Sequence, residues 1–140
     1  MNEFDVVVIG GAAAGLSAAL VLSRARRTVL VVDSGAPRNA PARHMHGFLS
    51  RDGLPPADLL AAGRQEVTGY GGRVVAGTVT DVTAGGSAGF HLLLADGSRV
   101  SARRLLLARP GGRTPGHPRT RRPVGPRRPA LPVLPRLRGP

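Results

Sequence analysis

The sequence predicts an α/β fold in which a parallel strand, helix, strand unit is followed by a small antiparallel β layer. Residues 4–9 form a short, unbroken, β-branched apolar run, which is typical of a parallel strand covered on both faces. Residues 12–27 are rich in Ala and Leu at helical spacing and end in arginines, which suit the carboxyl end of a helix. Residues 28–33 form a second β-branched run. This order, within about 30 residues, has the size of one βαβ unit.

A glycine-rich turn joins the first predicted strand to the helix. It reads Gly10-Gly11-Ala12-Ala13-Ala14-Gly15, so it matches the pattern G-x-G-x-x-G at its first and third glycines, with Ala12 in the middle position. In that pattern the glycines allow a tight turn, a close approach of the phosphates and packing of the helix on the strand. Backbone N–H groups and the positive end of the helix then face a pyrophosphate. The candidate phosphate-binding residues are therefore Gly10, Gly11, Ala12, Ala13 and Gly15.

An acidic residue closes the second predicted strand. Asp33 lies 18 residues after Gly15, where a carboxylate can accept hydrogen bonds from ribose hydroxyls. The alternative is an ordinary βαβ turn in which Asp33 caps a loop. Because the glycine turn has a strand before it, a helix after it and this acidic residue beyond it, the sequence favours a Rossmann-like, nucleotide-binding unit.

One more helix and three strands are predicted before residue 109. The helix spans about residues 57–70, and the alternating pattern of residues 73–82 predicts a single strand. Strands at 90–95 and 99–108 flank an Asp-Gly pair, which is typical of a β-hairpin. We expect this half-polar hairpin to be a solvated layer without a chemical role.

Two histidines lie in the loop that follows the βαβ unit. His44 and His46 are two residues apart, so in an extended segment they share a face and could form part of a metal site. A metal site needs more ligands, and the sequence offers no third one nearby. We therefore favour a polar contact with a bound cofactor, or solvent exposure, over a metal site.

The charge divides the chain after Ala108. The whole chain has 20 basic residues, all Arg, and 8 acidic ones, a net charge of +12. Residues 1–108 hold 11 Arg and every acidic residue, whereas residues 109–140 hold 9 Arg and 9 Pro. Because proline recurs throughout residues 109–140 and apolar residues are few, this tail is predicted to be disordered.

The composition also excludes several classes of protein. The sequence contains no Cys, which excludes disulfide frameworks and thiolate metal sites in the residues given. Aromatic residues are too few for the stacking surfaces of most single-strand binders, so no specific nucleic-acid partner is expected. The apolar run at 6–22 follows acidic residues and is broken by glycines, unlike a secretory signal. We expect a cytoplasmic protein without membrane contact.

Four segments occur together in the order of a known family. They are residues 6–22, the Asp33 region with Pro37-Arg38-Asn39-Ala40-Pro41, residues 44–56, and Ala95-Asp96-Gly97 before residues 104–108. In these segments residues 1–108 resemble thioredoxin-reductase-like, FAD-dependent pyridine nucleotide-disulfide oxidoreductases. The resemblance implies an FAD-binding, Rossmann-like domain with its pyrophosphate at Gly10 to Gly15. It also implies adenosine contacts and flavin contacts at Asp33, Ser34, Arg38, Asn39, His46 and the backbone at Val79.

The resemblance further implies what a complete member contains. A second domain binds NADPH and carries a Cys-x-x-Cys pair that exchanges electrons with the flavin. The partner is a thioredoxin-like protein or a small dithiol or disulfide, the complete protein can be a homodimer, and one subgroup acts as dithiol oxidases. In this chain Arg109-Pro110 stand where the family has an Ala-Thr-Gly turn. We therefore expect an incomplete FAD-binding domain without catalytic residues, inactive by itself.

A shifted reading frame is one interpretation of residues 109–140. With codons chosen as CTG CCC GTA CTG CCA CGG for residues 131–136, reading one base later gives Cys-Pro-Tyr-Cys-His. The same shift gives further family-like segments near residues 116–119 and 122–125. The alternative is a natural Arg/Pro-rich tail.

Three functions follow from these observations. The first is an FAD-dependent NAD(P)H oxidoreductase of the thioredoxin-reductase type, present here as an amino-terminal fragment. The second is a non-enzymatic fragment that binds FAD or ADP. The third is a nucleic-acid binder that uses the arginines of its tail for salt-dependent affinity without sequence preference.

Overall fold

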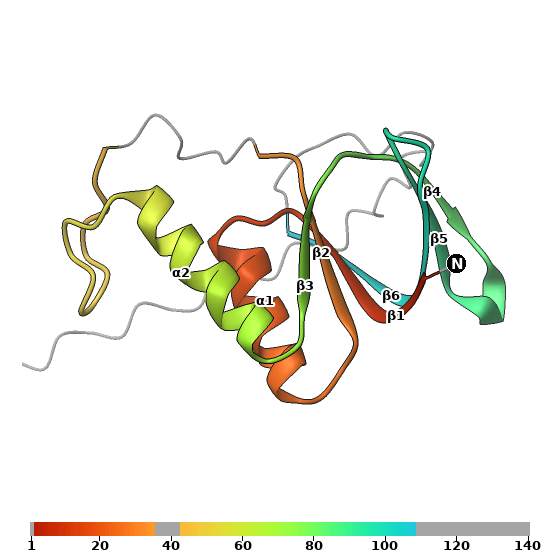
Figure 1. Cartoon of the computed structure of the whole chain (residues 1–140), viewed down its shortest axis with the longest axis horizontal. Helices are drawn as coiled ribbons and strands as arrows, with labels where there is room; N and C mark the ends of the chain where they lie inside the picture. The colour runs from red at the N-terminus through yellow and green to blue at the C-terminus, as the bar shows by residue number, and fades with distance from the viewer. Residues whose placement is uncertain (1, 36–42, 109–140) are drawn as a thin grey trace, which may run out of the picture.

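A computed structural model describes residues 2–35 and 43–108 of the chain (Figure 1). The segments predicted as a disordered or frameshifted tail, 109–140, and as FAD contacts, Arg38 and Asn39, lie outside these ranges. The elements of the described residues are β1 (Asn2–Ile9), α1 (Ala13–Arg24), β2 (Val29–Asp33), α2 (Pro56–Gly69), β3 (Arg73–Ala76), β4 (Val79–Ala84), a 3-10 turn (Gly86–Ala88), β5 (Phe90–Leu94) and β6 (Arg99–Leu107).

The strands form one mixed sheet in the order β3-β2-β1-β6-β5-β4. The four strands β3, β2, β1 and β6 run parallel, and β4, β5 and β6 pair antiparallel. Both helices lie on one side of the parallel part, as Figure 1 shows. This arrangement confirms the predicted α/β class, with a Rossmann-like βαβ unit and a small antiparallel layer.

The two central parallel strands, β1 and β2, are buried on both faces, as their apolar sequences predict. In β2 the side chains of Val29 and Val31 pack toward the helices, while Leu30 and Val32 pack on the opposite face. On the helix side, buried side chains of α1 and α2 complete a cluster with β1 and β2; these are Leu16, Ala19, Leu60 and Val67. The βαβ unit therefore buries its apolar face by adding α2 beside α1.

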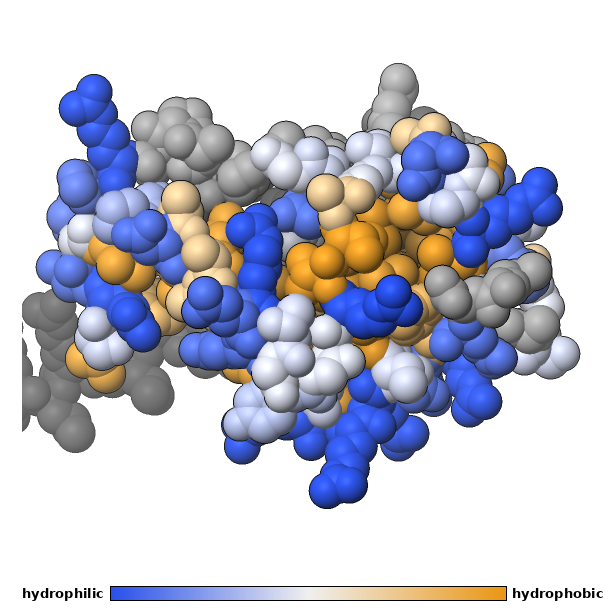
Figure 2. Space-filling model, in the orientation of Figure 1, coloured by the Kyte–Doolittle hydropathy of each residue, from blue (hydrophilic) through white to orange (hydrophobic). Residues whose placement is uncertain are grey.

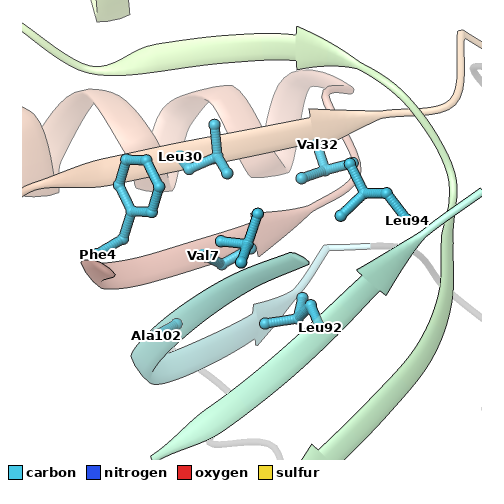
Figure 3. Packing of buried hydrophobic residues seen from close by; sticks show 8 residues of the cluster. Phe4, Val7, Leu30, Val32, Leu92, Leu94 and Ala102 are labelled. Atoms are coloured by element: carbon cyan, nitrogen blue, oxygen red, sulfur yellow. The ribbon is translucent and has the colours of Figure 1, made fainter. Parts of the chain in front are cut away.

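The second cluster lies between the parallel strands and the curled hairpin of β5 and β6. Figure 3 shows Leu92 and Leu94 of β5 facing Val7 and Val32 across this space. The side chain of Leu92 is only 1% exposed. The expectation of a solvated hairpin was therefore wrong for one of its faces, because that face covers the sheet. Figure 2 shows apolar side chains at the surface between β3 and β4, where this cover is incomplete.

Strand β6 belongs to both parts of the sheet. It pairs with β1 along almost its whole length, but its antiparallel pairing with β5 ends at Ala102. Among the described residues, no strand pairs with residues 104–107 on that side. The carboxyl half of β6 is therefore an open edge, and the side chain of Leu107 at its end is 58% exposed.

The strand predicted over residues 73–82 is in fact two strands. The first, β3, pairs with β2, and the second, β4, pairs with β5 on the other side of the molecule. The chain changes partner at Gly77 and Thr78. The N–H of Gly77 donates to the Asp33 carbonyl at 2.9 Å, and the Thr78 carbonyl accepts the N–H of Ala95 at 2.9 Å. An alternating sequence pattern persists through such a crossing because it records the face of each residue and not the strand beside it.

A reciprocal polar contact lies where the pairing of β1 with β2 begins, just before Val6 and Val29. The Asp5 carboxylate accepts the N–H and the hydroxyl of Thr28, each at 2.9 Å, and the N–H of Asp5 donates to the Thr28 hydroxyl at 2.8 Å. These hydrogen bonds, first the one from the Thr28 N–H, lower the pKa of Asp5.

No helix in the described ranges is long and apolar enough to cross a membrane.

Candidate functional site

The glycine turn lies at the carboxyl edge of the parallel strands, between β1 and α1 (Figure 1). Gly10 adopts a φ of 108°, a conformation that favours glycine, and its N–H donates to the Val32 carbonyl at 2.9 Å. A Cβ added at Gly15 would overlap the carbonyl oxygen of Gly10. The first and third glycines of the pattern therefore have the roles that the sequence predicts, a tight turn and close packing of the helix.

The first turn of α1 fits a phosphate group. Ala12 is the N-cap residue, its side chain makes no capping hydrogen bond, and the first turn contains no acidic residue. The N–H groups at a helix start have no partner within the helix and carry a partial positive charge. Ala12 has extended backbone angles, φ −79° and ψ −179°, which alanine adopts without strain. The loss of the middle glycine therefore does not distort this turn, and Ala13 is exposed beside it.

Gly11 connects the turn to the acidic residue at the end of β2. A Cβ at Gly11 would lie 2.7 Å from the Cβ, the Cγ and the Oδ2 atom of Asp33, closer than real side chains approach. The backbone of Gly11 thus lies directly against the Asp33 carboxylate. The structure brings together two features of the sequence, the turn predicted to bind phosphate and the carboxylate predicted to accept ribose hydroxyls.

The Asp33 carboxylate is held by two further partners. Its Oδ1 accepts the N–H of Gly35 at 3.2 Å, and its Oδ2 accepts a hydrogen bond from Nη2 of Arg64 at 3.0 Å. Burial by itself would raise the pKa of Asp33, but the hydrogen bonds from Arg64, Gly35 and Gly11 and the charge of Arg64 outweigh it and lower the pKa. The carboxylate is therefore ionised and acceptor-only at neutral pH, as ribose recognition requires.

Sequence reasoning did not find Arg64. It lies in α2, 31 residues after Asp33, and no local pattern places one beside the other. The available signal was its position on the buried face of the predicted helix, since Leu60, Arg64 and Val67 follow at spacings of four and three.

Of the other residues predicted to contact FAD, Ser34 and Val79 lie near the carboxyl end of β2 and His46 does not. Ser34 follows Asp33 and is exposed, and Val79 begins β4 two residues after Gly77, which is hydrogen-bonded to the end of β2. His46 lies in an exposed loop next to the start of α2, where its Nδ1 is 3.6 Å from Oδ1 of Asp52. The turn, Asp33 and the start of β4 thus share one edge of the sheet, whereas His46 lies in a separate loop.

The two histidines do not share a partner. Nδ1 of His44 is 3.0 Å from the carbonyl oxygen of Gly53, while His46 faces Asp52. The Oδ1 atom of Asp52 also accepts the N–H of Gly47 at 2.8 Å. Within the ranges that the structure describes, no group of three or more His, Cys, Asp or Glu side chains could hold a metal ion.

Comparison with known proteins agrees with this geometry. A family model described as an FAD binding domain matches residues 5–47, which include the glycine turn and Asp33. Thioredoxin reductase tcpT of Claviceps purpurea is 35% identical over an alignment of 115 positions, which covers 76% of this chain and 34% of that protein. A probable thioredoxin reductase of Arthroderma benhamiae is 44% identical over 69 residues, 49% of this chain and 17% of its own length.

Solved structures show the same similarity. The crystal structure of HlmI matches with 55% identity and a TM-score of 0.72, covering 76% of this chain and 34% of that one. An oxidoreductase from Agrobacterium tumefaciens matches with 45% identity and a TM-score of 0.70, over 75% of this chain and 36% of its own. A putative thioredoxin reductase TrxB from Bacillus anthracis matches with 36% identity and a TM-score of 0.72, over the same shares. The chain spans at most about one third of the length of its curated relatives.

Proposed function

Because this chain belongs to the thioredoxin-reductase-like family of FAD-binding oxidoreductases, we propose that residues 2–108 bind the ADP half of FAD at the carboxyl edge of β1 and β2. The observation that supports this most directly is the contact between Gly11 and Asp33. Because the glycine turn and an ionised carboxylate are in contact, one nucleotide would meet the turn with its phosphates and Asp33 with its ribose, which supports the proposal.

Each candidate residue then has a proposed role. The N–H groups of Ala12, Ala13 and Gly15 at the start of α1 bind the pyrophosphate. Gly10 and Gly11 donate their own N–H groups to Val32 and Asp33, and they shape the turn against which the phosphates lie. Asp33 accepts the ribose hydroxyls with Ser34 beside it, and the backbone at Val79 borders the adenine. Arg38 and Asn39 supply further contacts, and His46 lies toward the isoalloxazine.

The complete protein is proposed to transfer electrons between NAD(P)H and a disulfide or dithiol, with a thioredoxin-like protein or a small dithiol as its partner. When bound, FAD supplies a two-electron carrier for that reaction. The glycine turn and Asp33 would hold its ADP moiety in place at the carboxyl edge of the sheet. Because the sequence contains no Cys, we propose that the chain as written binds nucleotide without catalysing disulfide exchange.

We further propose that residues 109–140 are read from a shifted frame. The structural relatives named above match only 75–76% of this chain, and residues 109–140 combine Arg, Pro and Gly as a GC-rich gene read out of frame would. Sequencing the gene across codon 109 decides the matter. Codons that cannot encode Cys-x-x-Cys one base later would contradict this proposal.

The binding function is tested on the full 140-residue chain. Flavin absorbance in the purified protein, or calorimetric binding of ADP and FAD to the colourless protein, is the expected result. A colourless chain that binds ADP but not FAD would favour the non-enzymatic nucleotide-binding fragment. A chain that binds neither ligand would refute the proposed site.

A further inference from the structure

The ion pair between Arg64 and Asp33 joins two elements that are far apart in the sequence. Nη2 of Arg64 in α2 donates to Oδ2 of Asp33 at the end of β2, at 3.0 Å. The Asp33 side chain is 15% exposed and that of Arg64 is 41% exposed. The pair therefore lies at the protein surface beside the proposed nucleotide site, and its carboxylate is more buried than its guanidinium.

The guanidinium is carried by a firmly packed segment of α2. On the turns before and after Arg64, Leu60 and Val67 are buried against β1 and β2. The neighbouring residue, Gly63, lies so close to α1 that a Cβ there would be 3.2 Å from Cδ1 of Leu16. The backbone of α2 is thus fixed against the βαβ unit at the point where Arg64 leaves it.

The two carboxylate oxygens of Asp33 have different neighbours. Oδ2 accepts a hydrogen bond from Arg64 and lies on the side of Gly11, while Oδ1 accepts, from within the described residues, the N–H of Gly35 alone, at 3.2 Å. An ionised carboxylate has about four lone-pair directions. The carboxylate can therefore accept further hydrogen bonds. Because Arg64 and Gly35 donate to different oxygens, they also hold the carboxylate in one orientation.

We propose that Arg64 is a positioning residue for nucleotide recognition, which fixes the Asp33 carboxylate in the orientation that accepts the 2′- and 3′-hydroxyls of the adenosine ribose. The inference rests on the proposed ADP site. Arg64 acts through Asp33 and needs no contact with the nucleotide itself. Arg64 therefore affects selectivity between nucleotides, because a correctly oriented Asp33 carboxylate strengthens the binding only of a ligand whose hydroxyls can donate to it.

The alternative is that Arg64 only ties α2 to the sheet. In that case its removal would weaken binding of every nucleotide at this edge to the same degree. The two roles differ in a ligand comparison, because 2′,3′-dideoxy-ADP keeps the base and the phosphates of ADP but lacks the ribose hydroxyls.

The experiment measures ADP and 2′,3′-dideoxy-ADP binding to the full chain by calorimetry. The wild-type chain is expected to prefer ADP by about tenfold, the size of a charged hydrogen bond. Arg64→Met is expected to weaken ADP binding by about tenfold and to leave dideoxy-ADP within about twofold. Arg24→Met, which removes an exposed arginine at the opposite end of α1, should change neither affinity.

Two further variants keep the test decisive. Arg64→Lys retains the charge and should recover part of the preference for ADP, and it replaces Arg64→Met if that variant does not fold. Asp33→Asn should abolish the preference altogether. Equal weakening of both ligands by the Arg64 variants, or no weakening, would overturn the inference while leaving the ADP site intact. No binding of ADP by the wild-type chain would overturn both.

Discussion

The carbonyl oxygen of Gly10 occupies the space into which any side chain at Gly15 would point. Helix α1 therefore begins in contact with the backbone of the turn that precedes it, and no larger residue fits without displacing one or the other. We expect Gly15→Ala to lower the free energy of unfolding by about 2–3 kcal/mol, the usual cost of forcing atoms into a packed site.

Urea unfolding of the full chain measures this effect, and α2 offers a matched control. A Cβ at Gly69 would have no atom within 4 Å, and the residue is helical. Gly69→Ala is expected to raise the free energy of unfolding by about 0.5 kcal/mol, because it reduces the freedom of the unfolded chain. Equal effects at the two positions would contradict the close packing at Gly15.

Removal of the Asp33 charge tests the ribose site directly. Asp33→Asn keeps the size of the side chain but replaces one acceptor oxygen with an amide donor. We expect ADP to bind about tenfold more weakly, since hydrogen bonds to charged groups contribute about 1.5–3 kcal/mol. Calorimetry measures the affinity, and Asp58→Asn, at an exposed position in the first turn of α2, should leave it unchanged.

The lowered pKa of Asp33 gives the stability of the protein a defined pH dependence. A carboxyl group whose pKa is lower when folded stabilises the fold fully above its ordinary value, 3.8, and loses that contribution as the pH falls below it. The difference in unfolding free energy between the wild-type chain and Asp33→Asn should therefore shrink between pH 5 and pH 2.5. Urea unfolding across that range measures it, and a difference that grew on acidification would show that the sign is wrong.

The contact between Asp5 and Thr28 should support stability without supporting binding. Thr28→Val removes the hydroxyl that both donates to and accepts from Asp5. We expect a loss of about 1 kcal/mol in unfolding free energy, the usual net value of such hydrogen bonds. Because this contact lies where the β1–β2 pairing begins, away from the carboxyl ends of these strands, ADP affinity should not change. Weaker ADP binding in a folded Thr28→Val chain would argue against that separation.

Local patterns predicted the βαβ unit because its determinants are local. The β-branched runs around α1 and the glycines of the turn fix their own conformations, and the strands and helix appear where expected to within about three residues. The helix predicted to Arg27 ends at Arg24 because the chain turns at Arg26, whose φ is 58°.

The features that sequence reasoning missed depend on residues distant in the chain. The crossing at Gly77 is set by hydrogen bonds to Asp33 and to the β5 hairpin, and neither partner is visible in residues 73–82. Arg64 is recognisable as part of the site only once α2 lies beside β2. The hairpin sequence is half-polar because one face meets solvent, and only the curled sheet reveals that the other face covers Val7 and Val32.

The open edge of β6 has a consequence for the chain in solution. Residues 104–107 present backbone N–H and C=O groups in extended form, next to the exposed side chain of Leu107, with no strand beside them among the described residues. An edge of this kind pairs with strands of other molecules, which proteins normally prevent by covering it or placing charges along it. Arg104 is the single charged side chain in that stretch. We therefore expect two copies of the chain to meet first along these four residues, however large the net charge of the sequence.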